Sequence, residues 1–187
     1  MKQELKAHLL PLLIIFLITS LVWLIAKAPY YQFIFFFSGL ILGAFLLDFD
    51  HLIYWLFLNP KTEEARLAAI TLKHQDFRSL LKLLESTHKK HTNLIFHHFF
   101  FQITLALTSL FVFTSSDSVF VMAILMALNL HILVDEIVDY RSDKNHLRDW
   151  LFARETKQLP LKYLGLYITV FCILATFFFL ILVQSQI

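Results

Sequence analysis

Long apolar runs separated by short polar stretches dominate the chain. Five runs are long enough to cross a hydrocarbon core of about 30 Å, which takes about 20 helical residues. With only 3 Gly and 4 Pro among 187 residues, there is little material for a loop-rich or all-β fold. The pattern predicts an all-α, polytopic membrane helix bundle in which residues 1–187 form a single integral membrane domain. We expect the transmembrane helices at residues 7–26, 31–47, 94–114, 119–139 and 164–184.

A different pattern fills residues 62–87, between the second and third spans. Apolar residues from Leu67 to Leu84 recur there at helical spacing, with Lys73, Arg78 and Lys82 between them. Glu63 and Glu64 lie in the first turn, where the helix dipole favours acidic groups. We expect one amphipathic helix lying on the cytoplasmic face of the membrane. The alternative is a cytoplasmic helix that caps the bundle.

Composition agrees with a membrane protein and excludes several classes. The chain is 58% hydrophobic, with a mean hydropathy of +0.68, whereas soluble domains are about 45–50% apolar. A net charge of +2 is too small to predict nucleic-acid binding. The lone Cys172 cannot form an intramolecular disulfide, so cysteine does not indicate the compartment. For the first span, a cleaved signal peptide is an alternative, because Ala26-Lys27-Ala28 has the small-x-small form.

The basic residues alternate between the links and predict an orientation. Lys2 and Lys6 precede the first span, and only Lys27 follows it. Seven basic residues, Lys89 among them, lie between spans two and three, and six lie between spans four and five. None lies between spans three and four or after span five. Because basic loops stay in the cytoplasm, we expect a bacterial-type inner-membrane protein with a cytoplasmic N-terminus and an external C-terminus.

Ionisable residues interrupt three of the apolar runs, and they are the candidates for function. The predicted topology brings all three groups to the cytoplasmic half of the membrane. Charges at membrane depth are costly and are rarely kept without a partner or a task. Histidine and carboxylate side chains also bind divalent transition metals. The groups are Asp48, Asp50 and His51; His97 and His98; and His131, Asp135, Glu136 and Asp139.

Spacing within these groups sharpens the expectation of a metal site. His131 and Asp135 are four residues apart on one helix face and can bind one ion together. Apolar sequence resumes after His51, which predicts a break in a longer helix rather than a plain helix end. Of the adjacent His97 and His98, only one can point inward well, and either is also a candidate for an interhelical hydrogen bond.

We therefore assign provisional roles to these side chains. The predicted ligands of a divalent metal, Zn²⁺ first, in one or two ions, are Asp50, His51, His131 and Asp135, with His97 or His98 completing the shell. Asp48 either orients a ligand or acts as general base, which makes it the candidate catalytic residue. Possible additional ligands are His91, Glu136 and Asp139. The alternatives without a functional role are that Asp48 and Asp50 lie at the boundary between the membrane and water, and that Asp139 is a solvated loop residue.

The order of these motifs resembles a known family. Asp48-x-Asp50-His51, then histidines in a basic turn, then His131-x-x-x-Asp135 is similar to the YdjM-like family of LexA-binding, inner-membrane-associated, metal-dependent hydrolases. That family is itself distantly similar to zinc-dependent phospholipases C. Its His-Arg-x-x-x-His-Ser element has its nearest counterpart from His91 to His97-His98, which is one residue longer, has Thr92 at the arginine position and lacks the serine. The resemblance covers about residues 41–140 and implies metal-dependent hydrolysis.

Three functions follow as hypotheses. The first is hydrolysis of a phosphoester or lipid at the cytoplasmic membrane face by a metal-activated water. The second is a metal or proton transporter, or another ion-binding membrane protein, that uses the same residues. The third is a structural membrane subunit whose charges form interhelical pairs. Membrane lipid is the expected partner in each case, and the sequence predicts no particular protein partner.

Overall fold

The computed structural model describes residues 2–87 and 90–187, with side chains from residue 7 onward. Lys89, one of the basic residues used to orient the chain, lies outside the described residues. Throughout the described part the regular structure is helical, which confirms the all-α class. In chain order the elements are α1 (Lys2–Ile25), α2 (Tyr30–Leu46), α3 (Phe49–Ile53), the π-helix η1 (Tyr54–Leu58), α4 (Glu63–Lys73), α5 (Phe77–Thr87), α6 (Phe99–Ser115), α7 (Val119–Ser142), α8 (Lys144–Leu151) and α9 (Leu161–Gln184).

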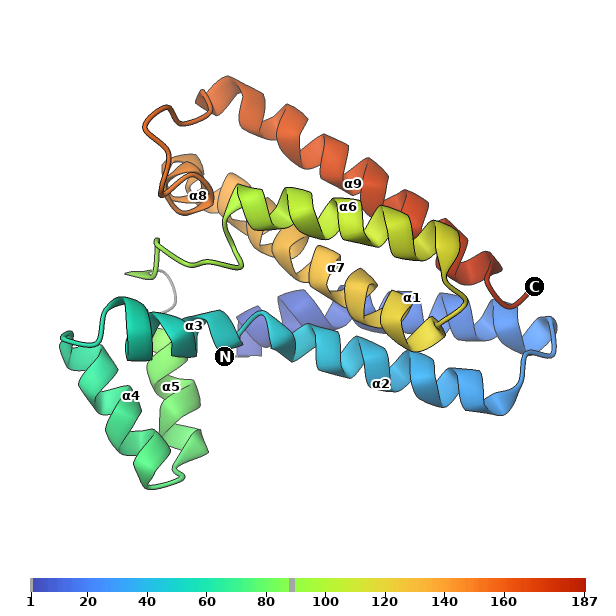
Figure 1. Ribbon diagram of the computed structural model, residues 1–187, viewed down its shortest axis with the longest axis horizontal. Helices are drawn as coiled ribbons and strands as arrows, with labels where there is room; N and C mark the ends of the chain where they lie inside the picture. The colour runs from blue at the N-terminus through green and yellow to red at the C-terminus, as the bar shows by residue number, and fades with distance from the viewer. Residues whose placement is uncertain (1, 88–89) are drawn as a thin grey trace.

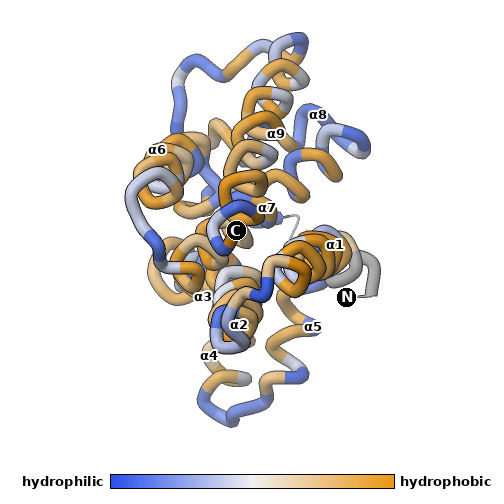
Figure 2. Tube along the Cα trace, turned by 90° about the vertical axis from the view of Figure 1, so that its right-hand side faces the viewer, coloured by the Kyte–Doolittle hydropathy of each residue, from blue (hydrophilic) through white to orange (hydrophobic). Residues whose placement is uncertain are grey.

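The long helices have the length and composition of membrane spans. Four segments of the described chain qualify: Ala7–Ile25, Tyr30–Leu58, Val119–Ser142 and Leu161–Gln184. The helix α6 is equally apolar but shorter, at 17 residues. Their outward faces carry leucine, isoleucine and phenylalanine, and Figure 2 shows hydrophobic residues along all five helices, with hydrophilic ones at the tip of the α4–α5 pair. The chain is therefore an all-α membrane helix bundle.

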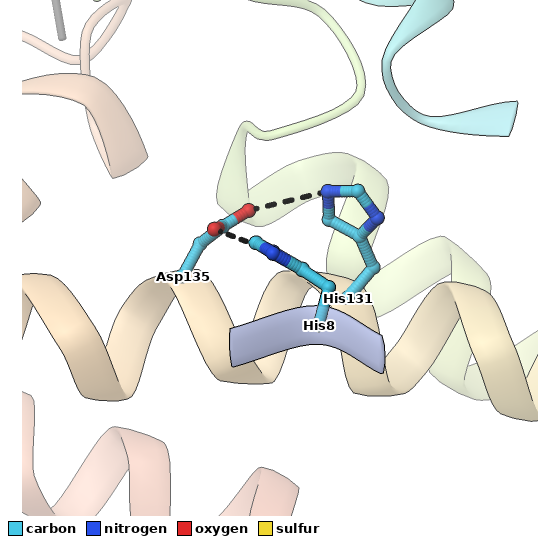
Figure 3. Close-up of side chains that lie close together, drawn as sticks. All are labelled: His8, His131 and Asp135. Atoms are coloured by element: carbon cyan, nitrogen blue, oxygen red, sulfur yellow. Dashed lines mark hydrogen bonds and ion pairs between the residues drawn. The ribbon is translucent and has the colours of Figure 1, made fainter. Parts of the chain in front are cut away.

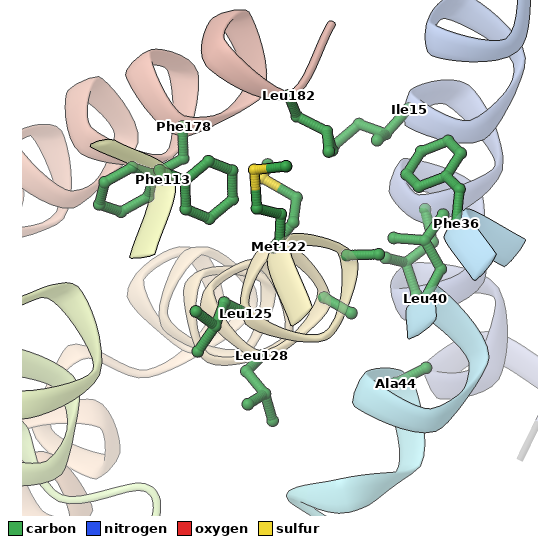
Figure 4. Close-up of a cluster of buried hydrophobic side chains, with 14 of the residues drawn as sticks. Ile15, Phe36, Leu40, Ala44, Phe113, Met122, Leu125, Leu128, Phe178 and Leu182 are labelled. Carbon is green, nitrogen blue, oxygen red and sulfur yellow. The ribbon is translucent and has the colours of Figure 1, made fainter. Parts of the chain in front are cut away.

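Helix α7 is the centre of the bundle. It packs against α1, α2, α6, α8 and α9. Its buried face contributes Met122, Leu125 and Leu128 to a core that also contains Phe36 from α2 and Phe178 from α9 (Figure 4). Because lipid is as apolar as leucine, such packing rather than exclusion from water holds transmembrane helices together.

The tightest helix contact lies between α2 and α7. A Cβ atom on Gly39 would lie 2.7 Å from the Cβ of Ala123, and one on Gly43 would lie 2.7 Å from the Cβ of Ala127. The two glycines and the two alanines are each four residues apart, so they form matching stripes of small residues that let the backbones approach. This contact places the end of α2 beside the middle of α7, where His131 lies.

All the predicted site groups lie at one end of the bundle. Figure 1 shows the N-terminus, the α2–α3 junction, the start of α6 and the end of α7 together at that end. The C-terminus and the links before α2 and before α7 lie at the other end. The structure therefore brings together the three groups of ionisable residues that the sequence separates.

The third span begins later than predicted. We expected a helix from residue 94, with His97 and His98 one turn inside it, but α6 begins at Phe99 and residues 91–98 form no helix. The Asp50 carboxylate accepts the backbone N–H groups of Ile95 and Phe96, at 3.1 and 2.5 Å. These amides bond a side chain from another segment instead of a helix, so the helix starts only after His98, whose ring caps it.

The predicted amphipathic helix over residues 62–87 is wrong as a single element. It is a hairpin of α4 and α5, interrupted at Gln75, whose φ is 55°. Such a left-handed residue ends a helix, and Asp76 then accepts the N–H of Ser79 at 3.0 Å and starts the next. Thr62 caps α4 in the same way by accepting the N–H of Ala65. The hairpin projects from the end of the bundle, across the direction of α2 (Figure 1).

The predicted break in the helix after α2 is confirmed, as a local change in helical winding rather than a full interruption. Leu47 and Asp48 keep right-handed helical dihedral angles, but Asp50 and His51 donate to carbonyls three residues back rather than four. The chain then continues through α3 and the π-helix η1. This local change of winding turns Asp50 and His51 inward, where both are fully buried.

Candidate metal centre

His131 lies on α7 with its ring orientation set by the backbone of α2. It is buried, and its Nδ1 lies 2.9 Å from the carbonyl oxygen of Ala44. A carbonyl can only accept, so Nδ1 carries the proton and Nε2 carries the lone pair. Metal-binding histidines are held in this way, with one ring nitrogen donating to a carbonyl while the other faces the ion.

Asp135, one turn further along α7, joins the other groups of the site. Its Oδ1 lies 2.9 Å from Nε2 of His8 on α1, and its Oδ2 lies 3.5 Å from Nε2 of His131 (Figure 3). The ligand atoms of His8, His131 and Asp135 all lie within 4.8 Å of one another. Two helices that are distant in the sequence thus present two imidazoles and a carboxylate to one point.

His97 approaches the same carboxylate from the irregular segment before α6. Its Nε2 lies 3.7 Å from Oδ2 of Asp135, and its Nδ1 lies 3.3 Å from Oδ2 of Asp50. With the Asp50 carboxylate as acceptor, Nδ1 carries the proton and Nε2 is turned toward Asp135. Of the two adjacent histidines, the structure therefore brings His97 to the cluster.

Asp50 supports the site rather than facing it. We expected it to be a metal ligand, but its two oxygens accept two backbone N–H groups and the Nδ1 of His97. A buried carboxylate with three donors is satisfied without a metal. Through these hydrogen bonds, Asp50 holds the segment before α6 in place and orients His97.

Asp48 is the exposed member of the cluster. Its Oδ1 lies 3.8 Å from Nε2 of His131, and 37% of its side chain is accessible. A half-exposed carboxylate beside the ligand atoms can exchange protons with water, as a general base must. The Asp48 side chain therefore lies where the candidate catalytic residue would need to be.

A second pair of imidazoles lies next to this cluster. Nδ1 of His51 is 2.8 Å from Nδ1 of His91, and the ring of His51 is 5.7 Å from that of His97, centre to centre. Nε2 of His91 lies 3.5 Å from Oε2 of Glu64 on α4. His91, a possible additional ligand from the sequence, thus connects the α4–α5 hairpin to His51.

The remaining predicted residues point elsewhere. His98 caps α6 by accepting the N–H of Phe100 at 3.3 Å, and both burial and the nearby Arg154 lower its pKa. Glu136 is fully buried on another face of α7, toward Gln102 and Tyr167. Two further contacts fix Asp139, which accepts Trp150 Nε1–H at 2.8 Å and lies 3.6 Å from His146 Nε2.

Sequence reasoning missed two residues of the site, His8 and Glu64. His8 follows Lys6 at the start of the first span, so the predicted topology already put it at the same end as the other groups. His8 belongs to none of the motifs that the sequence analysis identified. Glu64 was interpreted only as a first-turn acidic residue, and no local signal shows that it reaches His91.

The donor set fits a divalent transition metal. Ligand atoms about 2.0–2.1 Å from a tetrahedral zinc are about 3.3–3.4 Å apart. The separations of Asp135 Oδ2 from His131 and His97 Nε2, 3.5 and 3.7 Å, are close to this, and the His8 contact needs only a small outward movement. Imidazole and carboxylate are both side-chain groups that bind Zn²⁺ in proteins.

Comparisons of this chain with known protein families, with curated proteins and with solved structures gave no match. The functional argument therefore stands on the chemistry and geometry of the residues themselves.

Proposed function

We propose that this protein is a membrane-embedded, metal-dependent hydrolase that acts on a phosphoester, including a lipid phosphoester, at one membrane face. The observation that carries the proposal is the convergence of His8, His131 and Asp135 at one end of an apolar bundle. Ionisable groups at such a depth are costly, and His with Asp is a donor set for Zn²⁺. The proposed shell is completed by His97, with His51 beside it.

The chain's own residues divide the proposed chemistry among them. When bound, a divalent ion such as Zn²⁺ acidifies water and polarises a phosphoryl oxygen. The carbonyl of Ala44 and the carboxylate of Asp50 hold His131 and His97 with their Nε2 atoms toward Asp135. Asp48 removes a proton from the attacking water, because its carboxylate is both next to His131 and open to solvent.

The membrane location supports the lipid part of the proposal. The site lies at the bundle end that carries the α4–α5 hairpin, and the end of a membrane-spanning helix is within reach of lipid headgroups. The alternation of basic residues supports a cytoplasmic position for this end in a bacterial-type inner membrane. The measurement is labelling of single cysteines at Asp117 and Lys144, in a Cys172→Ser background, with an impermeant maleimide on intact cells. Only the cysteine at position 117 should react, and labelling at 144 alone would reverse the orientation.

Membership of the YdjM-like family is part of the same proposal. It is supported by Asp48-x-Asp50-His51 and His131-x-x-x-Asp135, whose side chains form one connected cluster. The stretch from His91 to His97 is one residue longer than the family pattern and lacks its arginine and its serine, yet both histidines reach the cluster or its immediate neighbours.

Metal analysis of purified protein tests the metal part of the proposal. Wild type should contain stoichiometric metal, and His131→Ala should lose it because the variant lacks a ligand atom. His74→Ala is the matched control, since His74 is exposed at the end of α4 and should leave the metal content unchanged. A wild-type protein that neither contains nor takes up Zn²⁺, Mn²⁺ or Co²⁺ would sink the proposal.

A second measurement separates metal binding from catalysis. The Asp48→Asn variant should keep its metal and lose hydrolysis by about 10²–10⁴-fold, the usual contribution of a general base. The panel consists of soluble phosphoesters and phospholipids in mixed micelles. Metal without hydrolysis of any member would instead favour the transport function, which transfer of ⁶⁵Zn²⁺ across proteoliposome membranes would then reveal.

A further inference from the structure

The contact between the α4–α5 hairpin and the buried histidines involves Glu64. Oε1 of Glu64 lies 3.0 Å from Nζ of Lys90, and Oε2 lies 3.5 Å from Nε2 of His91. His91 is almost fully buried and stacks on Tyr54, with ring centres 4.2 Å apart. Glu64 itself is one-quarter exposed. A carboxylate at the edge of the hairpin thus touches an imidazole that leads inward.

These groups cannot share one metal ion. Glu64 meets Nε2 of His91, whereas His51 meets Nδ1 of the same ring. The two ring nitrogens of an imidazole point away from each other, so an ion held by one pair would not touch the third residue. The arrangement is therefore a chain of polar contacts that runs from Glu64 through His91 to His51.

Such a chain selects a tautomer. An ionised carboxylate has no hydrogen to donate, so a neutral His91 places its proton on Nε2, toward Glu64. Nδ1 of His91 is then the acceptor of the 2.8 Å contact, and Nδ1 of His51 is the donor. His51 consequently keeps its lone pair on Nε2, which is the same state that Ala44 imposes on His131 and Asp50 on His97.

We propose that Glu64 is a positioning residue that acts through His91 to hold His51 in the Nδ1–H tautomer, ready to bind metal through Nε2. Nζ of Lys90 lies 3.0 Å from the other oxygen of this carboxylate. The inference rests on the proposed function, because it matters only if the cluster binds metal. It gives the α4–α5 hairpin a role at the site, since α4 carries the first residue of the chain of contacts.

The test compares Glu64→Gln with Glu63→Gln in the full-length protein. Glu63 is the preceding, exposed residue of the same helix turn, so both variants remove one charge from the α4 N-terminus. Because outer partners of ligand histidines typically contribute 10–100-fold to metal affinity, we expect Co²⁺ binding to weaken by about 10–100-fold in Glu64→Gln and to stay unchanged in Glu63→Gln. Equal affinities in the two variants would overturn the inference while leaving the metal site intact.

Long-range ¹H–¹⁵N spectra of ¹⁵N-histidine-labelled, metal-free protein read the tautomer directly. Wild type and Glu63→Gln should show His51 protonated on Nδ1 and His91 protonated on Nε2, and Glu64→Gln should lose this pattern. A purely structural role for Glu64 would not change which nitrogen carries the proton. Wild-type protein with His51 protonated on Nε2, or with His91 protonated on both nitrogens, contradicts the inference even if metal binds. Absence of Co²⁺ binding in wild type contradicts the proposed function instead.

Discussion

Asp50→Asn is the sharpest test of how the candidate centre is built. Asp50 is fully buried and accepts the N–H groups of Ile95 and Phe96 with its two separate oxygens, at 3.1 and 2.5 Å. Asparagine has nearly the same shape but only one oxygen, so its NH₂ group must face one of these donors. One part-buried backbone N–H then loses its charged acceptor.

The magnitude follows from that single lost acceptor. A hydrogen bond to a charged group contributes about 1.5–3 kcal/mol, and a buried donor left unsatisfied costs a similar amount. We expect Asp50→Asn to lower the free energy of unfolding by about 2–4 kcal/mol. Asp48→Asn is the matched control, two residues earlier and partly exposed, and its ion-pair contact at 3.8 Å is worth less than about 1 kcal/mol.

The assay is reversible unfolding in mixed detergent micelles, followed by tryptophan fluorescence, together with hydrogen exchange of the Ile95 and Phe96 amides. Exchange should accelerate at these two amides in Asp50→Asn and stay slow in Asp48→Asn. Unchanged stability with unchanged protection of both amides would refute the role assigned to Asp50. Metal affinity should also fall in Asp50→Asn, because His97 loses the acceptor that orients it.

Two further predictions concern packing and pH. A Cβ on Gly43 would lie 2.6 Å from the carbonyl oxygen of Ile124, so Gly43→Ala should force α2 and α7 apart and lower the free energy of unfolding by about 1–3 kcal/mol. The control is Gly165→Ala, whose Cβ would meet a tyrosine hydroxyl at 2.9 Å and should cost clearly less in the same unfolding assay. Equal losses of stability in the two variants would contradict this account. Because burial and Arg154 lower the pKa of His98, the unfolded chain takes up its proton first, and stability should fall as the pH drops below about 6.5. The capping variant His98→Asn, which cannot titrate, should remove that part of the pH dependence, and an unaltered pH profile would argue against it.

Most of the fold was predictable because each long apolar helix is determined by its own segment of the sequence. Four of the five expected spans coincide with α1, α2, α7 and α9 to within a few residues. The pattern works there because every backbone group within a lipid-facing helix bonds inside the same helix. It failed at residues 94–98 and at Gln75, where the backbone bonds side chains or takes a left-handed conformation. Neither event leaves a mark in hydrophobic periodicity.

The sequence predicted which types of side chain form the candidate site, but not all the residues that belong to it. Spacing alone identified His131 with Asp135, because residues four apart on a helix must share a face. Spacing could not show that His8 joins them from α1, since that depends on how α1 packs against α7. The structure also separates the two carboxylates of the first motif, leaving Asp48 partly open to solvent and placing Asp50 on the backbone before α6.

The sequence by itself thus determined the all-α membrane bundle, the kinds of ligand-type side chain and the end of the bundle at which they gather. These features depend on the spacing of apolar residues, on the length of each apolar run and on the number of membrane spans. Only the tertiary structure decided which ring nitrogen of His131 and of His97 faces Asp135, and which carboxylates face the cluster. Those choices are made by single acceptors from distant segments, such as the carbonyl of Ala44 and the carboxylates of Asp50 and Glu64. A contact partner 27 or more residues away has no local sequence signature, and so it becomes visible only once the helices are packed.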